Sequence, residues 1–223
     1  MNLHLLQLAD SALPIGGYSH SWGLEAAVDW GLVRNALSLE AWVRSWLFEV
    51  VGPLEGVVVA GVCRAVQKGD WAAVLEANDL LEASLAPSTL RSASHEMGEQ
   101  LLALAEAWPW ASERATTLRE SQDATRWHHA VVFATLAASV AEPEQAVAVC
   151  LHQAALGMIG AGVRAIPIGH THGQQILARL HDDINDLAAE LATQNLQMAG
   201  SFSPAYEILC HAQTQLYTRL FRS

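Results

Sequence analysis

The longest apolar run of the chain covers residues 146–168, and it predicts a helix that is buried on most of its sides. Three polar side chains interrupt the run, and in so short a hydrophobic span they argue against a membrane-spanning helix. Pro143 suits the first turn of this helix, and Pro167 closes it because the residue before a proline avoids helical geometry. We therefore expect this helix to form the centre of the core.

Helical periodicity recurs along most of the remaining chain. Apolar residues three or four positions apart, bounded by glycine, proline or capping residues, predict helices over 3–9, 18–30, 38–50, 54–66, 70–85, 88–108, 127–140, 173–194 and 204–217. No run of alternating β-branched residues predicts a strand. The pattern predicts an all-α fold, a single domain over residues 1–223 with about ten helices around the buried central helix.

Specific residues mark several of the predicted helix boundaries. Ser38 is the expected N-cap of one helix, and Thr117 with Glu120 has the spacing of a capping box. Gly52-Pro53 is expected to break the chain, because proline removes a backbone donor inside a helix. Ser203-Pro204 is a suitable N-cap and first-turn pair for the last helix. Together these signals divide the chain into short helices.

Composition indicates which partners and which compartment the protein has. Of its 223 residues, 52% are apolar and only 16% are charged, which is rich for a monomer and indicates that a partner covers some of the surface. The net charge of −11 argues against nucleic acid and anionic membranes as main partners. Three widely spaced cysteines indicate a reducing compartment, and the N-terminus lacks the pattern of a signal peptide. We therefore expect a cytoplasmic protein.

Signature motifs of common enzyme classes are absent from the sequence. There is no GxxxxGK[ST] loop, no dinucleotide-binding glycine pattern, no HExxH and no GxSxG. Neighbouring carboxylates such as Asp182-Asp183 occupy adjacent helix positions that face different ways, as on a solvated helix surface. We therefore predict neither catalytic residues nor a cofactor.

The histidines leave two interpretations open. They include His20, His128-His129, His170-Thr-His172, His181 and His211, which follows Cys210. A metal site needs three or four ligands that converge at about 2.0–2.3 Å, and a His-x-His pair supplies two at most. The histidines are therefore either structural or interfacial groups, or transition-metal ligands of a small α-helical, histidine-rich metal-binding protein or metalloenzyme. Because no ligand set is complete, we assign no metal site.

Charge is unevenly distributed towards the C-terminus. From Ile208 onward there is no acidic side chain, and Arg219 and Arg222 lie close to Phe221 in the sequence. The pattern fits an apolar, basic element that docks on an acidic partner. It equally fits a frayed tail whose arginines keep it soluble.

An ordered set of motifs resembles the UreF family of urease accessory proteins. The first is LLQLADSALPIGGYSHSWGLEAAV at residues 5–28, an apolar helix followed by Pro-x-Gly and an aromatic-Ser-x-Ser-x-Gly-Leu-Glu run. The others follow in the family's order: Leu90-Arg91 with Met97-Gly98, His128-His129 with Val131-Val132-Phe133, Val163-Arg164 through Ile166-Pro167 to Gly169 and Gly173-Gln174, and His211 with Tyr217 and the ending Arg219 to Ser223. The matches span essentially the whole chain.

The resemblance implies an all-helical homodimer without enzymatic activity of its own. It implies an adaptor that bridges a scaffold protein of the UreD/UreH type, which contacts apo-urease, and the GTPase UreG. Such a complex delivers nickel to the urease active site, coupled to GTP hydrolysis by UreG. The absence of a nucleotide-binding loop from this chain agrees with that division of labour.

The resemblance also implies partner-binding residues in two places. The C-terminal docking tail, residues 217–223, is expected to become ordered on binding the scaffold, with Phe221 as a buried anchor and the arginines as charged contacts. A second surface near the start of the chain is expected to lie near UreG. The candidates are Tyr217, Arg219, Leu220, Phe221, Arg222, Ser223 and His211 at the C-terminal end, and Pro14, Gly16, Tyr18, Ser19, Gly23 and Glu25 on the second surface.

Arg91 and Gln174 complete the set of candidate partner-binding residues. Gln174 belongs to the motifs quoted above. Arg91 lies near a predicted helix N-terminus, where a positive charge opposes the helix dipole. This unfavourable position motivates the hypothesis that Arg91 serves an interface or a buried ion pair.

Overall fold

The computed structural model describes residues 2–121 and 126–223, and within these ranges the chain is helical and contains no strand. The elements are α1 (Leu3–Leu8), η1 (Gly17–Ser19), α2 (Leu24–Asp29), α3 (Ala36–Trp46), η2 (Leu47–Gly56), α4 (Val57–Lys68), α5 (Trp71–Ser84), α6 (Ser88–Ala105), α7 (Ser112–Glu120), α8 (His129–Ala137), α9 (Pro143–Ala165), α10 (His170–Leu191), η3 (Leu196–Met198) and α11 (Pro204–Gln213). The prediction of an all-α, single-domain fold is confirmed.

Helices α3 and α4, joined by η2, form one continuous rod over Ala36–Lys68. At a rise of 1.5 Å per residue, the rod is about 50 Å long. The expected break at Gly52-Pro53 is therefore wrong. Pro53 lies inside η2, a π-helix, whose wider turn relieves the clash between a proline ring and the preceding turn.

Contacts from a distant loop satisfy carbonyl groups of the π-helix. The carbonyl of Pro53 accepts a hydrogen bond from the N–H of Gly200 at 3.0 Å. The carbonyl of Glu49 accepts one from the hydroxyl of Ser203 at 3.2 Å. These two bonds tie the residues before α11 to the rod and help to hold it in its unusual geometry.

Two predicted capping signals are wrong. The rod is capped by Asn35, whose side chain accepts the N–H of Ser38 at 3.0 Å, while the Ser38 hydroxyl accepts the N–H of Asn35 at 3.0 Å. Ser38 is therefore the third residue of the helix and not its N-cap. Thr117 lies inside α7, where its hydroxyl donates to the carbonyl of Glu113 at 3.0 Å, so Thr117 and Glu120 form no capping box.

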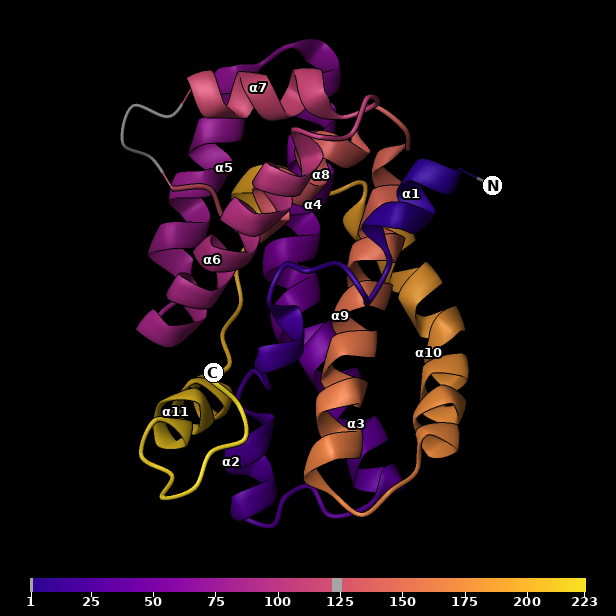
Figure 1. Cartoon of the computed structure of the whole chain (residues 1–223), viewed down its shortest axis with the longest axis vertical. Helices are drawn as coiled ribbons and strands as arrows, with labels where there is room; N and C mark the ends of the chain where they lie inside the picture. Colours follow the sequence, from indigo (N-terminus) through magenta and orange to yellow (C-terminus); the bar gives the residue numbers. More distant parts are fainter. Residues whose placement is uncertain (1, 122–125) are drawn as a thin grey trace.

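Helix α9 occupies the centre of the fold, but one strip of it is open. It packs against α10, α4, α3 and α2 (Figure 1). A Cβ atom on Gly162 would lie 2.5 Å from the Leu39 side chain, so glycine allows that close approach. At Gly157 and Gly160, a Cβ would meet no atom of the described residues within 4 Å. The helix is thus buried on the sides that face these neighbours and open along this strip.

The rod and α9 are long and apolar enough to cross a membrane, by length and composition alone. Core helices of soluble proteins pass the same test, so this is weak evidence. In the fold, 67% of the most apolar window of the rod and 50% of that of α9 are buried. Both helices are therefore explained as core elements.

The remaining helices gather at the two ends of the rod (Figure 1). Helices α5, α6, α7 and α8 form a group around α4, while α2 and α11 pack together near the C-terminus. Helix α10, which the sequence predicted over 173–194, runs along α9 and buries a stripe of apolar residues, Leu177, Leu180, Ile184, Leu187 and Leu191. That prediction is confirmed. The last helix, α11, ends at Gln213 and leaves the final residues as an extended tail.

Candidate functional site

The predicted helix over 18–30 is interrupted, and the interruption positions the N-terminal candidate residues. Trp22 and Gly23 have positive φ angles of 52° and 81°, and α2 begins only after them. Helix α11 lies so close that a Cβ on Gly23 would be 3.0 Å from the Cys210 sulfur. Left-handed geometry and close contact both favour glycine here. The prediction of one continuous helix over this segment is wrong for that reason.

The turn that precedes this segment contains Pro14 and Gly16. Gly16 has a φ of 86°. Its carbonyl accepts the N–H of Ser19 at 3.0 Å and the Ser19 hydroxyl at 2.8 Å. Pro14 is exposed beside it. These residues shape the turn that presents Tyr18.

The backbone of the C-terminal tail pairs with residues 19–22. The consecutive N–H groups of Ser21 and Trp22 donate to the carbonyl of Ser223 at 2.5 and 3.1 Å, and the N–H of Arg222 donates to the carbonyl of Ser19 at 2.8 Å. The sequence predicted a tail that becomes ordered on a partner. In the structure, the tail instead lies against its own chain.

Glu25 fixes the tail from the first turn of α2. Its carboxylate accepts the N–H of Leu220 at 2.6 Å and the N–H of Phe221 at 3.2 Å. Such charge-assisted bonds are stronger than neutral ones, and a negative charge in the first turn also suits the helix dipole. We call residues 19–25 and 220–223 together the tail clamp.

Arg164, near the end of α9, contacts both the N-terminal segment and the tail. Its guanidinium lies 3.6 Å from the centre of the Tyr18 ring and 4.6 Å from that of Phe221, and it donates to the Tyr18 carbonyl at 2.7 Å. These are cation–π distances. Phe221 is buried, at 4% exposure, whereas Tyr18 is 76% exposed. Phe221 is therefore an anchor within its own chain, and most of the Tyr18 ring faces solvent.

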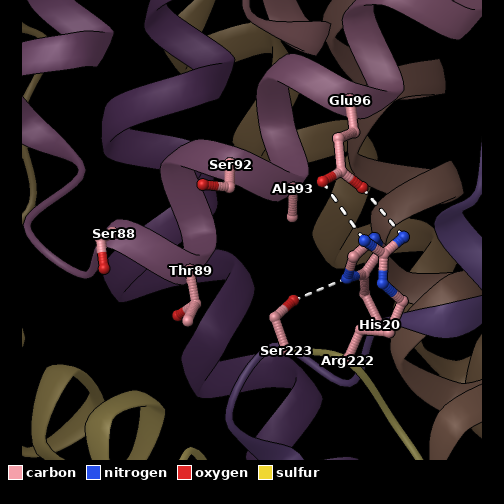
Figure 2. Close-up of a pocket in the computed structure, with 8 residues that line it drawn as sticks. All are labelled: His20, Ser88, Thr89, Ser92, Ala93, Glu96, Arg222 and Ser223. Carbon is pink, nitrogen blue, oxygen red and sulfur yellow. Dashed lines mark hydrogen bonds and ion pairs between the residues drawn. The ribbon is translucent and has the colours of Figure 1, made fainter.

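A small cavity of about 170 Å³ borders the tail clamp beside the first turns of α6 (Figure 2). Figure 2 shows Arg222 paired with Glu96, at 2.9 Å, and His20 directed at Ser223, with Nδ1 2.6 Å from the hydroxyl. The volume is below the roughly 300–1,000 Å³ of small-molecule pockets. We conclude that the cavity is a by-product of tail docking and not a substrate pocket.

His20 is held neutral by its surroundings. Burial, and secondly the nearby Arg222 guanidinium, lower the pKa of His20 below its usual value of 6.5, while Glu96 acts in the opposite direction. The neutral ring suits a single hydrogen bond with the Ser223 hydroxyl. The docked tail therefore contacts an uncharged imidazole.

The outward side of the tail carries exposed apolar side chains. Tyr217 is fully exposed and Leu220 is 72% exposed, and Arg219 and His211 are also on the surface. Among the predicted partner-binding residues, Gly23, Glu25, Phe221 and Ser223 are thus buried in the tail clamp, whereas Leu220 and Arg222 of the tail clamp, and Tyr217, Arg219 and His211 beside it, are exposed. Partner binding by these residues stays a prediction.

Arg91 serves the end of the preceding helix. Its guanidinium donates to the carbonyls of Leu85 and Ala86, the latter at 2.8 Å, and lies 3.5 Å from the Glu82 carboxylate. The C-terminal carbonyls of α5 carry partial negative charge, so they offset the unfavourable position of Arg91 on α6. Gln174 is exposed on the first turns of α10, outside the tail clamp.

The histidine pair that the sequence singled out caps a helix. The Nδ1 atom of His172 accepts the N–H of Gly169 at 3.3 Å, at the start of α10. In the described part of the chain, ligand-type atoms converge instead at Glu82, His95 and His128, all within 4.8 Å of one another. We call these three residues the histidine corner.

Sequence reasoning missed several of these residues. Glu82 and His95 lie 13 positions apart on different helices, and no spacing links them to His128. Glu96, likewise, carried no signal. Arg164 did carry one, because it is a charged residue inside the longest apolar run.

Comparison with known proteins identifies the family. The UreF family model matches residues 33–181. The chain is 35% identical over 225 residues to the urease accessory protein UreF of Polynucleobacter asymbioticus, covering 98% of this chain and 96% of the relative. It is 35% identical over 224 residues to the protein of that name from Cupriavidus metallidurans, covering 99% and 97%, and 32% identical over 224 residues to that from Dechloromonas aromatica, covering 98% and 96%. These relatives are accessory proteins and not enzymes, which agrees with the prediction of no catalytic activity. The chain belongs to the UreF family of urease accessory proteins.

Proposed function

We propose that this chain is an adaptor in urease maturation, which bridges a scaffold protein of the UreD/UreH type and the GTPase UreG. Through that complex it supports GTP-dependent delivery of nickel to apo-urease. Family membership supports the accessory role. The observation that carries the proposal is the tail clamp. Its hydrogen bonds fix the backbone of both chain ends and so place exposed side chains of the two ends close together.

The exposed residues have the chemistry of a protein interface. Tyr18, Tyr217 and Leu220 are each more than two-thirds exposed, and aromatic residues and arginine dominate the energetics of protein interfaces. The backbone beneath them is already hydrogen-bonded. A partner therefore meets a surface that is largely ordered, which lowers the entropy lost on binding.

The two ends of the chain have different partners in this proposal. Tyr217, Arg219 and Leu220 contact the scaffold, and Tyr18 with the turn at Gly16 contacts UreG. Because Arg164 lies against both Tyr18 and Phe221, a scaffold that grips the tail also restrains the UreG-binding side chain. One partner then prepares the surface for the other.

The experiment is co-purification of both partners with defined variants. Tyr217→Ala/Leu220→Ala removes exposed side chains but keeps every backbone bond of the tail clamp. We expect it to weaken scaffold binding about 30-fold or more, the effect of losing about 2 kcal/mol at an interface hot spot. Truncation after Leu216 removes the tail clamp itself and is expected to abolish the complex with both partners.

Two further variants serve as controls for the tail substitutions. Leu3→Ala/Leu6→Ala removes exposed leucines from α1, at the other end of the molecule, and is expected to leave both complexes intact. Tyr18→Ala is expected to lose UreG while it keeps the scaffold. If the truncated chain retains both partners in full, the tail does not bind them. If the intact chain forms no complex with either partner, the adaptor function is contradicted.

A homodimer and a cytoplasmic location belong to the same proposal. The high apolar fraction supports a second copy that covers part of the surface. The three cysteines are buried free thiols, which supports a reducing compartment. Light scattering on the isolated chain tests the dimer, and a mass of 24.0 kDa at all concentrations contradicts it.

A further inference from the structure

The histidine corner joins three elements that are distant in sequence. Glu82 lies on α5, His95 on α6, and His128 is the N-cap of α8. The Glu82 carboxylate oxygen Oε2 is 2.9 Å from His95 Nε2 and 3.2 Å from His128 Nε2. The two imidazole rings are stacked, with centroids 3.9 Å apart. Two ring nitrogens and one carboxylate oxygen thus approach the same small volume.

His128 has an unsatisfied nitrogen at this point. Its side chain is fully buried, and Nε2 lies 3.2 Å from the Glu82 carboxylate but has no hydrogen-bond partner that meets the geometric criteria within the described part of the chain. A buried polar atom without a partner is destabilising by about 1–3 kcal/mol. Such an atom in a native fold calls for an explanation, and a bound water or ion is one that this position allows.

The other side of the His128 ring is fixed by hydrogen bonds. Nδ1 lies 3.1 Å from the Ser94 hydroxyl, and the backbone N–H of His128 donates to the Asn78 side chain at 2.9 Å. Metal-bound histidines characteristically use their second nitrogen in this way, which fixes the ring orientation. Ser94 and Asn78 are themselves buried. The nitrogen Nε2 is therefore held in place towards Glu82.

Backbone packing adds to this rigidity. A Cβ on Gly98 would lie 2.3 Å from the carbonyl of Trp127 and 3.1 Å from the backbone of His128. Glycine on α6 therefore lets the residues before α8 come close enough for His128 to reach His95. The corner is preorganised, in the sense that its ligands need little movement to bind an ion.

The spacing and the donor set suit one class of ion. Tetrahedral ligands at about 2.0–2.2 Å from zinc lie about 3.3 Å from one another. The two distances from the Glu82 oxygen to the imidazole nitrogens are 2.9 and 3.2 Å, and all three atoms lie within 4.8 Å of one another. Imidazole and carboxylate together favour zinc, nickel and similar divalent transition metals, and not calcium or magnesium.

We propose that Glu82, His95 and His128 form a binding site for one divalent transition-metal ion of the zinc–nickel class, which clips α5, α6 and the start of α8 together. The three ligands leave a fourth position for water. Arg91 holds the other oxygen of the carboxylate, at 3.5 Å, and so orients Glu82. This proposal is independent of the adaptor function.

Only one of the two histidines has an outer hydrogen bond, because His95 Nδ1 is buried without a partner among the described residues. Loss of such a bond weakens metal binding 10- to 100-fold. We therefore expect an exchangeable site, and not one that needs denaturation to release its metal.

The test is equilibrium binding of Zn²⁺ and of Ni²⁺, each alone, to the full chain after treatment with a chelator. We expect one equivalent of either ion in the intact protein. We expect at least a tenfold weaker affinity in His95→Ala and in Glu82→Gln. The Glu82 side chain is 53% exposed and that of His95 is 11% exposed, so Glu82→Gln is the milder change. Circular dichroism checks that both variants keep the fold.

A matched control separates this corner from other histidines. His170→Ala/His172→Ala removes two exposed imidazoles and is expected to leave the first equivalent unchanged. A second readout is thermal unfolding, where the ion is expected to raise the midpoint of the intact chain and of the control but not of His95→Ala. The proposal is overturned if neither ion binds stoichiometrically, or if binding survives in both corner variants. Loss of binding in the control alone overturns it as well, and none of these results bears on partner binding.

Discussion

The tail clamp joins two distant parts of the chain and the histidine corner joins three, and the two regions are held by different forces. The tail clamp consists mainly of backbone hydrogen bonds, the Glu25 carboxylate and the Arg164 guanidinium near the surface. The histidine corner depends on close packing of α6 against the residues before α8, through Gly98. One is a set of polar contacts, and the other is part of the core.

The difference predicts how each region opens. Release of the tail breaks a few hydrogen bonds and exposes little besides Phe221, so it resembles the local opening of a chain end. Opening the histidine corner separates packed helices and therefore approaches global unfolding. A protein that changes partners is expected to use the first kind of region as its moving part and the second as its fixed frame.

The largest expected effect is on global stability and comes from disturbing the packing of α6 at the histidine corner. Gly98→Ala places a methyl group 2.3 Å from the Trp127 carbonyl, and the resulting overpacking is expected to lower the free energy of unfolding by about 2–3 kcal/mol. Urea denaturation measures it. The control is Gly157→Ala on α9, which has open space and is expected to raise stability by about 1 kcal/mol through helix propensity. Equal effects of the two substitutions contradict the packing argument.

The next largest effect comes from a substitution that releases the tail but leaves the packed helices unchanged. Glu25→Ala leaves the N–H groups of Leu220 and Phe221 without their acceptor, which is expected to weaken tail docking by about 2 kcal/mol. Hydrogen exchange of these two amides is expected to accelerate, while the urea midpoint moves little. Asp29→Ala, on the exposed side of the same helix, is the control. A large loss of global stability in Glu25→Ala would show that the tail belongs to the core.

The tail clamp is expected to be sensitive to pH because of His20. Its pKa is lowered in the docked state by burial and by Arg222, against the influence of Glu96 on α6, so protonation favours the released tail. Exchange protection of the tail is therefore full above the usual histidine pKa of about 6.5 and falls as the pH decreases below it. His20→Asn keeps a polar group and removes the titration, so its profile is expected to be flat. Protection that rises on acidification contradicts this sign.

The smallest expected effect concerns the ion pair between Arg222 and Glu96. Both side chains are largely exposed, at 64% and 42%, so Arg222→Ala is expected to weaken tail docking by only about 0.5 kcal/mol. Salt at about 0.5 M is expected to remove the difference from the intact chain. An effect as large as that of Glu25→Ala would mean that side-chain charge, and not backbone pairing, holds the tail.

Local sequence patterns predicted the parts of the fold that depend on local physics. The apolar stripe of α10 and the order of the helices follow from a period of 3.6 residues, which needs no knowledge of distant contacts. The break expected at Pro53 failed because Gly200 and Ser203 supply hydrogen bonds from far along the chain. The cap expected at Ser38 failed because Asn35 is an equally good cap three residues earlier.

The candidate site was predicted in part, for the same reason. The motifs named both halves of the tail clamp, since the chain ends carry aromatic, glycine and arginine residues in a recognisable order. They did not indicate that the halves bind each other, because the acceptors for the tail lie about 200 positions away. The histidine corner could not be predicted from the sequence. Its three residues follow no recognisable sequence spacing, and they come together only after α6 and α8 have packed.

The π-helix η2 has a consequence for how related sequences can change in length. Removing one residue there restores ordinary helical bonding but rotates α4 by about 100° relative to α3. That rotation turns Cys63 away from the Ala134 carbonyl on α8, which its sulfur now meets at 3.3 Å. Deletions and insertions are therefore expected to accumulate in the connections between helices and to avoid the interval between Trp46 and Val57, although it contains both a glycine and a proline.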